Sequence, residues 1–237
     1  MITKLTLINI LLIITIIIMI LYNKLIYNKP LERKNNFEFH LTNLPSKFLK
    51  YRIFHNINSD LFKRVNLPNR KGEGIGYEDI KANNMNCFIE LYENKDFLNL
   101  ISNIVGEKIF VCPEFDKHRI GIYKYCKKGD FIDWHYDKSF YNGRRYTVLI
   151  CLKNSNIQQQ CNLEYKYKGK IYQWDSDKFN MIIFHGNTLY HRVTKMKEYE
   201  SKTTDRIVFT MEYVTDTKIN FINKLIDDIK NRIVYKF

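Results

Sequence analysis

Short apolar runs separated by polar or glycine-bearing turns dominate the second half of the chain. Runs of this length, rich in β-branched and aromatic residues, are typical of a barrel or jelly roll rather than a parallel α/β sheet. From residue 109 onward the nine runs are IFVC, IGIYKY, FIDWHYD, YTVLICL, CNLEYKYKG, KIYQW, FNMIIF, LYHRVT and RIVFTMEYV. The pattern predicts a mainly β (α+β) domain over 85–217, with its β core at about 109–214.

Helical periodicity flanks these runs on both sides. Between Met85 and Val105 apolar residues recur every three or four positions, which predicts one or two amphipathic helices ending at a Gly106 cap. The tail over 218–237 predicts another amphipathic helix, packed on the outside of the sheet. Its apolar positions are Ile219, Ile222, Ile226, Ile229 and Ile233.

The amino-terminal segment is apolar throughout. From Leu5 to Tyr22 no residue is charged, and this helix would be about 27 Å long, close to the hydrocarbon thickness of a bilayer. No small-residue cleavage site follows it, so the sequence predicts an uncleaved, single-pass transmembrane anchor over 1–24. More basic residues follow the segment than precede it, which favours a cytoplasmic catalytic domain, with a lumenal domain as the alternative.

The region 25–84 is polar and basic, with three prolines and few periodic apolar positions. It is interpreted as a stalk that leads into irregular or short helical structure. The stretch RKGEGIGYED (70–79) contains three glycines. It neither follows a clear strand nor opens a phosphate-binding helix, so it is interpreted as a loop.

Composition narrows the class of protein. Hydrophobic residues make up 45% of the chain and aromatic residues 15%, which indicates a packed core rather than disorder. The formal charge is +13, but the basic residues are spread along a chain rich in Lys, Ile and Asn. Without clustering among stacking aromatics, this charge does not favour a nucleic-acid partner.

The cysteines do not read as a disulfide framework, because they are odd in number and form no CxxC pair. They are predicted to stay reduced. If the domain faced an oxidising lumen, a Cys112–Cys126 or Cys151–Cys161 disulfide would be possible. The five are Cys87, Cys112, Cys126, Cys151 and Cys161.

Candidate metal ligands occur in FIDWHYDK and LYHRVT. His135 and Asp137 are two positions apart, so on a strand both side chains point to the same side. An imidazole and a carboxylate directed at one point are two-thirds of a facial triad for iron(II). His191, on another predicted strand 54 positions after Asp137, offers the third ligand.

Arg206 begins the last β run and shares a face with Val208 and Thr210. An arginine that faces the interior of a barrel is costly unless an anion pairs with it. A dicarboxylate co-substrate and a structural ion pair with an acidic side chain on a neighbouring strand both meet this need.

The order HxD, a gap of some fifty residues, His, and Arg fifteen residues later resembles the Fe(II)/2-oxoglutarate-dependent dioxygenase superfamily, especially its prolyl-hydroxylase-like branch. Tyr125 followed by Gly129, Asp130 and Phe131 resembles the Y…GDF lead-in of that branch, and GRRYTVLICLKN (143–154) resembles its next strand. The phrases WHYDKSFYNGRRYT and YHRVT…EYVTD are also similar to a smaller group of hydroxylases and halogenases of free amino acids.

The resemblance implies a double-stranded β-helix (jelly roll) with flanking helices. It implies Fe(II) as the metal, 2-oxoglutarate and O₂ as co-substrates, and ascorbate as a reductant. The implied activity couples decarboxylation of 2-oxoglutarate to hydroxylation of an amino acid, free or within a protein. The implied site residues are His135, Asp137 and His191 for the metal, Arg206 for the distal carboxylate of 2-oxoglutarate, and Tyr125 and Thr210 as assisting residues.

Within this resemblance, Asp137 favours hydroxylation, since halogenases of this kind replace the carboxylate with a small residue. Nucleic-acid demethylases usually carry a second arginine six residues beyond the first, where this chain has Glu212. A catalytically inactive, membrane-tethered binding module is the third interpretation, and the complete triad disfavours it. His191 is preferred to His185 as the ligand because its spacing to Arg206 fits. Neither the substrate nor the oligomeric state follows from the sequence.

Overall fold

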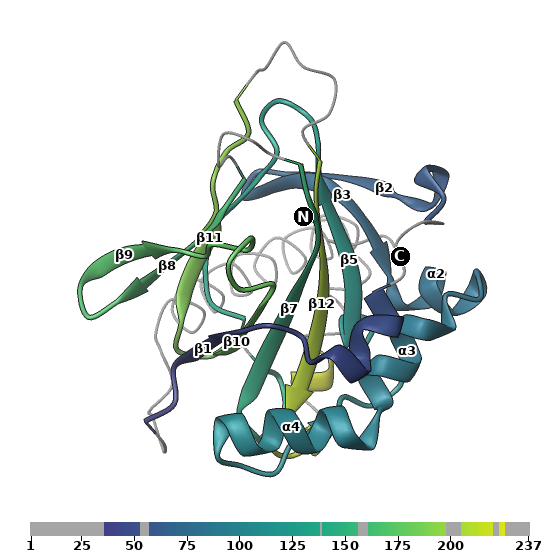
Figure 1. Ribbon diagram of the computed structural model, residues 1–237, viewed down its shortest axis with the longest axis vertical. Helices are drawn as coiled ribbons and strands as arrows, with labels where there is room; N and C mark the ends of the chain where they lie inside the picture. The colour runs from purple at the N-terminus through teal and green to yellow at the C-terminus, as the bar shows by residue number, and fades with distance from the viewer. Residues whose placement is uncertain are drawn as a thin grey trace, which may run out of the picture.

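One twelve-stranded sheet, in which all paired neighbours run antiparallel, forms the body of the protein (Figure 1). This computed structural model describes residues 36–52, 57–137, 139–155, 161–197, 205–219 and 223–225. The strand order is β1-β10-β7-β12-β5-β3-β6-β11-β8-β9, with β2 paired to β3 and β4 paired to β12. Neighbours in the sheet are thus mostly distant in sequence.

The strands are β1 (Phe39–Thr42), β2 (Lys63–Leu67), β3 (Arg70–Gly76), β4 (Phe110–Val111), β5 (Ile120–Tyr125), β6 (Phe131–His135), β7 (Arg145–Asn154), β8 (Leu163–Tyr167), β9 (Lys170–Gln173), β10 (Met181–His185), β11 (Tyr190–Val193) and β12 (Arg206–Val214). The helices are η1 (Ser46–Arg52), η2 (Ser59–Leu61), α2 (Tyr77–Ala82), α3 (Asn86–Glu93) and α4 (Lys95–Val105).

The sheet curls so that its two halves enclose an apolar interior. Leu149 and Phe184, on β7 and β10, belong to the same buried cluster as Leu163 and Val193, on β8 and β11. Side chains alternate along a strand, so each strand contributes every second residue to this interior. The interior of the curl is where the candidate site lies.

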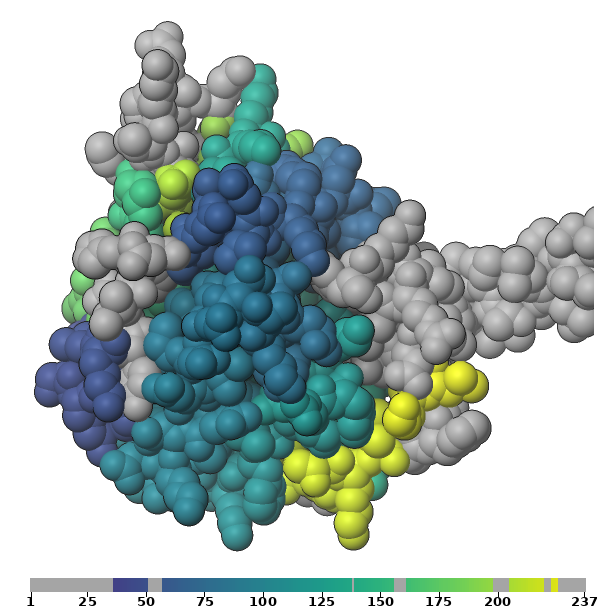
Figure 2. Space-filling view, turned by 90° about the vertical axis from the view of Figure 1, so that its right-hand side faces the viewer, coloured from purple at the N-terminus to yellow at the C-terminus, as the bar shows by residue number. Residues whose placement is uncertain are grey.

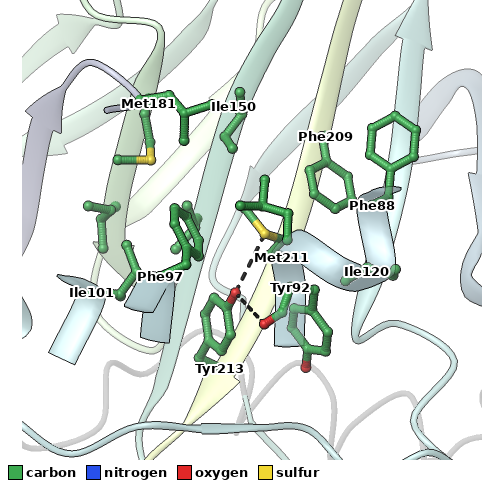
Figure 3. Packing of buried hydrophobic residues seen from close by; sticks show 14 of the residues in the cluster. Phe88, Tyr92, Phe97, Ile101, Ile120, Ile150, Met181, Phe209, Met211 and Tyr213 are labelled. Atoms are coloured by element: carbon green, nitrogen blue, oxygen red, sulfur yellow. Dashed lines mark hydrogen bonds between the residues drawn. The ribbon is translucent and has the colours of Figure 1, made fainter. Parts of the chain in front are cut away.

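Helices cover the opposite, outer face of β5, β7, β10 and β12. Figure 3 shows Phe88 and Tyr92 of α3 beside Phe209 and Tyr213 of β12, and Phe97 of α4 belongs to the same buried layer. The same helices, in blue to teal, form the central surface in Figure 2. This packing buries the apolar stripe of each helix, which stabilises helices that would be marginal alone.

The helix ends follow from local sequence. The Asn94 side chain accepts hydrogen bonds from the backbone N–H groups of Asp96 and Phe97 and so caps the start of α4. Gly106 ends α4 in the left-handed conformation, with φ 73°. The predicted helices between Met85 and Val105 and their glycine cap are therefore confirmed.

Each of the nine predicted β runs contains a strand, β4 to β12. The mainly β class is confirmed, and the curled antiparallel sheet with flanking helices is consistent with a jelly roll. All five cysteines are free thiols, in agreement with the prediction that they form no disulfide framework.

The interpretation of 70–79 as a loop is wrong. Residues 70–76 form β3, which pairs with β2, β5 and β6. The described part of the predicted stalk also contributes β1, which pairs with β10. From residue 36 onward, this region therefore adds strands β1, β2 and β3 to the sheet, and it also contains short helices, as predicted: η1, η2 and α2.

The predicted membrane anchor, residues 1–24, lies outside the described residues and stays a prediction. Among the residues that are described, no helix is both long and apolar enough to cross a bilayer. Most of the predicted tail helix, 218–237, also lies outside them. Of that tail, Ile219 forms a β-bridge with Tyr141 and packs against Cys112 and Val214.

We expect Phe97→Ala to lower the free energy of unfolding by about 3–5 kcal/mol, because it removes a fully buried ring from the layer between helices and sheet. The Phe97 ring contacts Phe48 edge to face at 5.2 Å between centroids. Phe115→Ala is the matched control, since Phe115 is 44% exposed. Urea unfolding followed by circular dichroism measures both, and equal losses would contradict the packing described here.

Candidate metal and co-substrate site

Two histidines face each other across neighbouring antiparallel strands in the interior of the curl. His135 ends β6, and its register partner on β11 is His191, with ring centroids 4.2 Å apart. The carboxylate of Asp137 lies beside both, its Oδ1 3.4 Å from His135 Nε2 and its Oδ2 3.5 Å from His191 Nε2. One donor atom from each residue lies within 4.8 Å of the other two.

A bulge directs His135 into this interior. His191 pairs with His135, whereas Val193 pairs with Ile132, so β6 holds one residue more than β11 over this stretch. Ile132 and His135 are three positions apart and would face opposite ways on a regular strand. The extra residue turns both inward, which is the usual effect of a β-bulge.

Backbone carbonyls fix the tautomer of both imidazoles. His135 Nδ1 lies 2.7 Å from the carbonyl of Asp133, and His191 Nδ1 lies 3.0 Å from that of Leu189. A carbonyl can only accept a hydrogen bond, so each Nδ1 carries the proton and donates it. In the neutral imidazole each Nε2 then presents its lone pair toward Asp137, as a metal ligand must.

Electrostatics keep His191 and Asp137 in the protonation states that bind metal. Burial and the neighbouring His135 lower the pKa of His191 to about 4, and Asp137 opposes this only in part. Burial alone would raise the pKa of Asp137, but His191, His135 and Arg145 hold it well below its ordinary value. Near neutral pH, His191 is therefore a neutral imidazole beside the ionised carboxylate of Asp137.

Asp137 lies two residues beyond the end of β6, so strand alternation does not place it. Instead, Gly186 lets the β10–β11 turn approach it closely. A Cβ at Gly186 would lie 2.6 Å from the backbone oxygen of Asp137 and 3.0 Å from its Cβ. This close approach requires glycine.

The turn before β6 is fixed by Asp130, which is fully buried. Its Oδ2 accepts hydrogen bonds from the backbone N–H groups of Cys126 and Lys127, and its Oδ1 lies 2.5 Å from Arg64 Nη2. Gly129 takes φ 84° within this turn. The GDF triplet noted in the sequence therefore builds the turn that leads into His135.

Arg206 is buried in the same interior. Its side chain is 2% exposed, and its guanidinium lies 5.7 Å from the ring centroid of Tyr125 and 5.6 Å from that of Trp174. Among the described residues no carboxylate forms an ion pair with it, so the structural ion pair left open by the sequence is not formed there. A buried guanidinium without an acidic partner is a strong anion site.

The two predicted assisting residues are placed differently relative to Arg206. Tyr125 is the register partner of Arg206 on β5 and is buried. Thr210 is four residues further along β12 and is half-buried. Of the two, the structure brings Tyr125 next to Arg206.

His185 lies on the other face of the sheet. Phe184, its neighbour on β10, contacts His191 edge to face, whereas His185 packs against Tyr146 in the helix-covered layer. Alternation along β10 therefore directs His185 away from the three candidate ligands.

Sequence reasoning missed a buried polar group beside Asp137. Thr147 of β7 lies with its Oγ1 3.0 Å from Asp137 Oδ2 and 2.8 Å from Glu212 Oε2. Arg145 Nε donates to the same Glu212 oxygen at 2.7 Å. Burial, opposed in part by Arg145, raises the pKa of Glu212 to about 7. The only sign of these buried polar residues in the sequence is the alternation in RYT, which places Arg145 and Thr147 on one face of the strand, opposite Glu212.

Two small hollows of about 20 Å³ each lie beneath the β2–β3 hairpin. One is lined by Arg70, Gly72, Tyr125 and Ile132, among others, and the second shares Arg70 with it.

Solved structures with a similar fold include three oxygenases. A prolyl-4-hydroxylase from Pseudomonas putida has a TM-score of 0.50 and 12% identity over 76% of this chain and 94% of its own. A 2-oxoglutarate–Fe(II) oxygenase family protein from Burkholderia pseudomallei has a TM-score of 0.51 and 11% identity over 74% of this chain and 81% of its own. A Trichoplax adhaerens prolyl hydroxylase, solved with a hypoxia inducible factor peptide, has a TM-score of 0.51 and 18% identity over 77% of this chain and 85% of its own.

This chain has the fold of the 2-oxoglutarate–Fe(II) oxygenases. The predicted resemblance to that superfamily and its prolyl-hydroxylase-like branch is confirmed at the level of the fold. Residues 55–143 also match the family model of Halogenase D, in agreement with the predicted likeness to the halogenase group. That match includes His135 and Asp137 and ends before His191. No curated protein matches this sequence.

We expect His191→Ala to abolish binding of Mn²⁺, used as a spectroscopic stand-in for Fe²⁺, because it removes one of three converging donors. His185→Ala is the matched control and should leave Mn²⁺ affinity within roughly threefold, since His185 faces the opposite layer. Electron paramagnetic resonance of free Mn²⁺ measures both. Loss of binding in His185→Ala alone would show that the ligand was assigned to the wrong histidine.

Gly186→Ala should displace Asp137 and weaken Mn²⁺ binding by roughly 10–100-fold, the size of effect seen when the support of a ligand is disturbed. The added methyl group would overlap the Asp137 backbone. Gly76→Ala is the control, because a Cβ there meets nothing within 4 Å. Unchanged affinity in Gly186→Ala would mean that the turn does not hold the carboxylate.

Proposed function

We propose that this chain is an Fe(II)- and 2-oxoglutarate-dependent dioxygenase that hydroxylates an amino acid, either free or as a residue in a protein. The observation that carries the proposal is the convergence of His135, Asp137 and His191, with both Nε2 lone pairs facing the carboxylate. Two imidazoles and one carboxylate are the ligand set typical of non-haem iron(II) oxygenases.

The metal site fits this role because it is accessible from one side. The side chain of His135 is 32% exposed and that of Asp137 is 21% exposed, whereas that of His191 is only 5% exposed. His191 is thus anchored in the apolar interior while the other two ligands border solvent. Three protein ligands leave the remaining positions of an octahedral ion for the co-substrates.

Arg206 fits the distal carboxylate of 2-oxoglutarate. A guanidinium binds a carboxylate through two parallel hydrogen bonds, and the apolar surroundings strengthen that pair. The rings of Tyr125 and Trp174 flank the guanidinium and keep water from it. Binding of the dicarboxylate would supply the acidic partner that Arg206 lacks among the described residues.

Iron(II) bound with 2-oxoglutarate would activate O₂, so that one oxygen atom enters succinate, the other enters the substrate as a hydroxyl, and CO₂ leaves. The protein's part is positioning. The histidines and Asp137 hold the metal, Arg206 orients the co-substrate, and the buried rings exclude water.

Halogenation is the second candidate, because the Halogenase D family model matches residues 55–143. Asp137 weighs against it. A halide would need the coordination position that this carboxylate takes, and the carboxylate here is held by Thr147 and enclosed by Gly186. Hydroxylation is therefore preferred.

Two further candidates have less support. A nucleic-acid demethylase would need a second arginine where the chain has Glu212, which is ion-paired with Arg145. A catalytically inactive binding module has no use for two imidazoles held in the metal-binding tautomer. Succinate release by the purified protein would exclude this last candidate.

We expect His135→Ala and Asp137→Ala to abolish 2-oxoglutarate-dependent succinate release, because each removes a metal ligand. Arg206→Ala should raise the 2-oxoglutarate concentration at half-maximal rate by roughly 10–100-fold, since it removes a charged hydrogen-bond donor pair. Arg192→Ala is the control, because Arg192 pairs with Glu164 at the surface. Succinate measured over a panel of free amino acids and peptides tests these outcomes, and unchanged turnover in the ligand variants would falsify the assignment.

A further inference from the structure

The hydroxyl of Thr147 lies between two carboxylates in the interior of the curl. Its side chain is fully buried, and its Oγ1 is within hydrogen-bond distance of both Asp137 Oδ2 and Glu212 Oε2. Thr147 and Glu212 are register partners on β7 and β12, so the pairing of these strands fixes that contact. Asp137, in contrast, reaches Thr147 from the loop after β6.

A hydroxyl carries one proton and can donate to only one of these oxygens at a time. Glu212 Oε2 already accepts from Arg145 Nε, which lies two residues before Thr147 on the same face of β7. A proton must also lie between Glu212 Oε2 and Thr147 Oγ1, which are 2.8 Å apart. A Glu212 that keeps its proton, which burial favours by raising its pKa to about 7, donates to Thr147 and leaves the threonine proton for Asp137 Oδ2.

This hydrogen bond separates the roles of the two oxygens of Asp137. Oδ2 accepts from Thr147, whereas the described residues provide Oδ1 with no contact closer than His135 Nε2, at 3.4 Å. Gly186 leaves room for the arrangement, since a Cβ there would lie 3.2 Å from Thr147 Oγ1 as well as overlapping Asp137.

We propose that Thr147 is a positioning residue that makes Asp137 bind a divalent metal through Oδ1 alone, and that a protonated Glu212, held by Arg145, keeps the Thr147 hydroxyl directed at Asp137. This inference rests on the proposed function. A carboxylate restricted to one oxygen takes one coordination position instead of two, which preserves positions for 2-oxoglutarate and O₂. The Arg145–Glu212 pair acts through Thr147 and touches neither metal nor co-substrate.

The test compares Thr147→Val with Thr147→Ser. Valine keeps the shape of threonine but has no hydroxyl, whereas serine keeps the hydroxyl and loses the methyl group. We expect Thr147→Val to weaken Co²⁺ and Mn²⁺ binding by roughly 10–100-fold and to alter the visible absorption bands of the Co²⁺ protein. Thr147→Ser should restore both to within about threefold of the wild-type protein.

Glu212→Gln probes the supporting pair. The glutamine side chain can still accept from Arg145 through its carbonyl, and its amide can donate to Thr147, which leaves the threonine proton on Asp137. We expect metal affinity and the Co²⁺ spectrum to be retained in this variant. If Thr147→Val does not fold, as judged by near-ultraviolet circular dichroism, Thr147→Ala carries the same expectation as Thr147→Val.

The outcomes separate this inference from the proposed function. A wild-type protein that binds no metal and releases no succinate would overturn both. A wild-type protein that binds metal, together with unchanged affinity and spectrum in Thr147→Val, would overturn only the role of Thr147. Equal losses in the valine and serine variants would also overturn it, because the methyl group rather than the hydroxyl would then matter.

Discussion

The pairing of β6 with β11 is the constraint on which the site depends. His135 and His191 meet because these strands are in one register and because a bulge in β6 turns His135 inward. A slip by one residue would direct His191 to the outer face, since side chains alternate. The apolar residues around the pair hold that register. Val193 and Ile132 pack in the inner cluster, and exposing them to water would lower the free energy of unfolding.

The two faces of the sheet serve different purposes. The outer face is apolar and is covered by α3 and α4, which supplies most of the hydrophobic stabilisation. The inner face carries buried charges, among them Arg145, Arg206 and Glu212. Burying charges costs free energy of folding, and the packing of the helices against the outer face offsets that cost.

The sequence predicted the strands and helices whose apolar residues are periodic, and it missed those where that signal is weak. In β3 the alternate positions Gly72, Gly74 and Gly76 carry no side chain, so no alternation is visible. The rings of Tyr125 and Tyr123 lie close to the first two of these glycines. That packing depends on pairing with β5, about fifty residues later, which local sequence does not encode.

The candidate ligands could be predicted from residue chemistry and spacing, whereas the contacts that hold Asp137 in place could not. Strand alternation predicts Asp137 beside His135, but Asp137 lies beyond the strand, where Thr147 and Gly186 enclose it. Those contacts join β7 and the β10–β11 turn to the loop after β6. Contacts between segments this far apart in the chain depend on the pairing of the whole sheet, so no local motif could have indicated them.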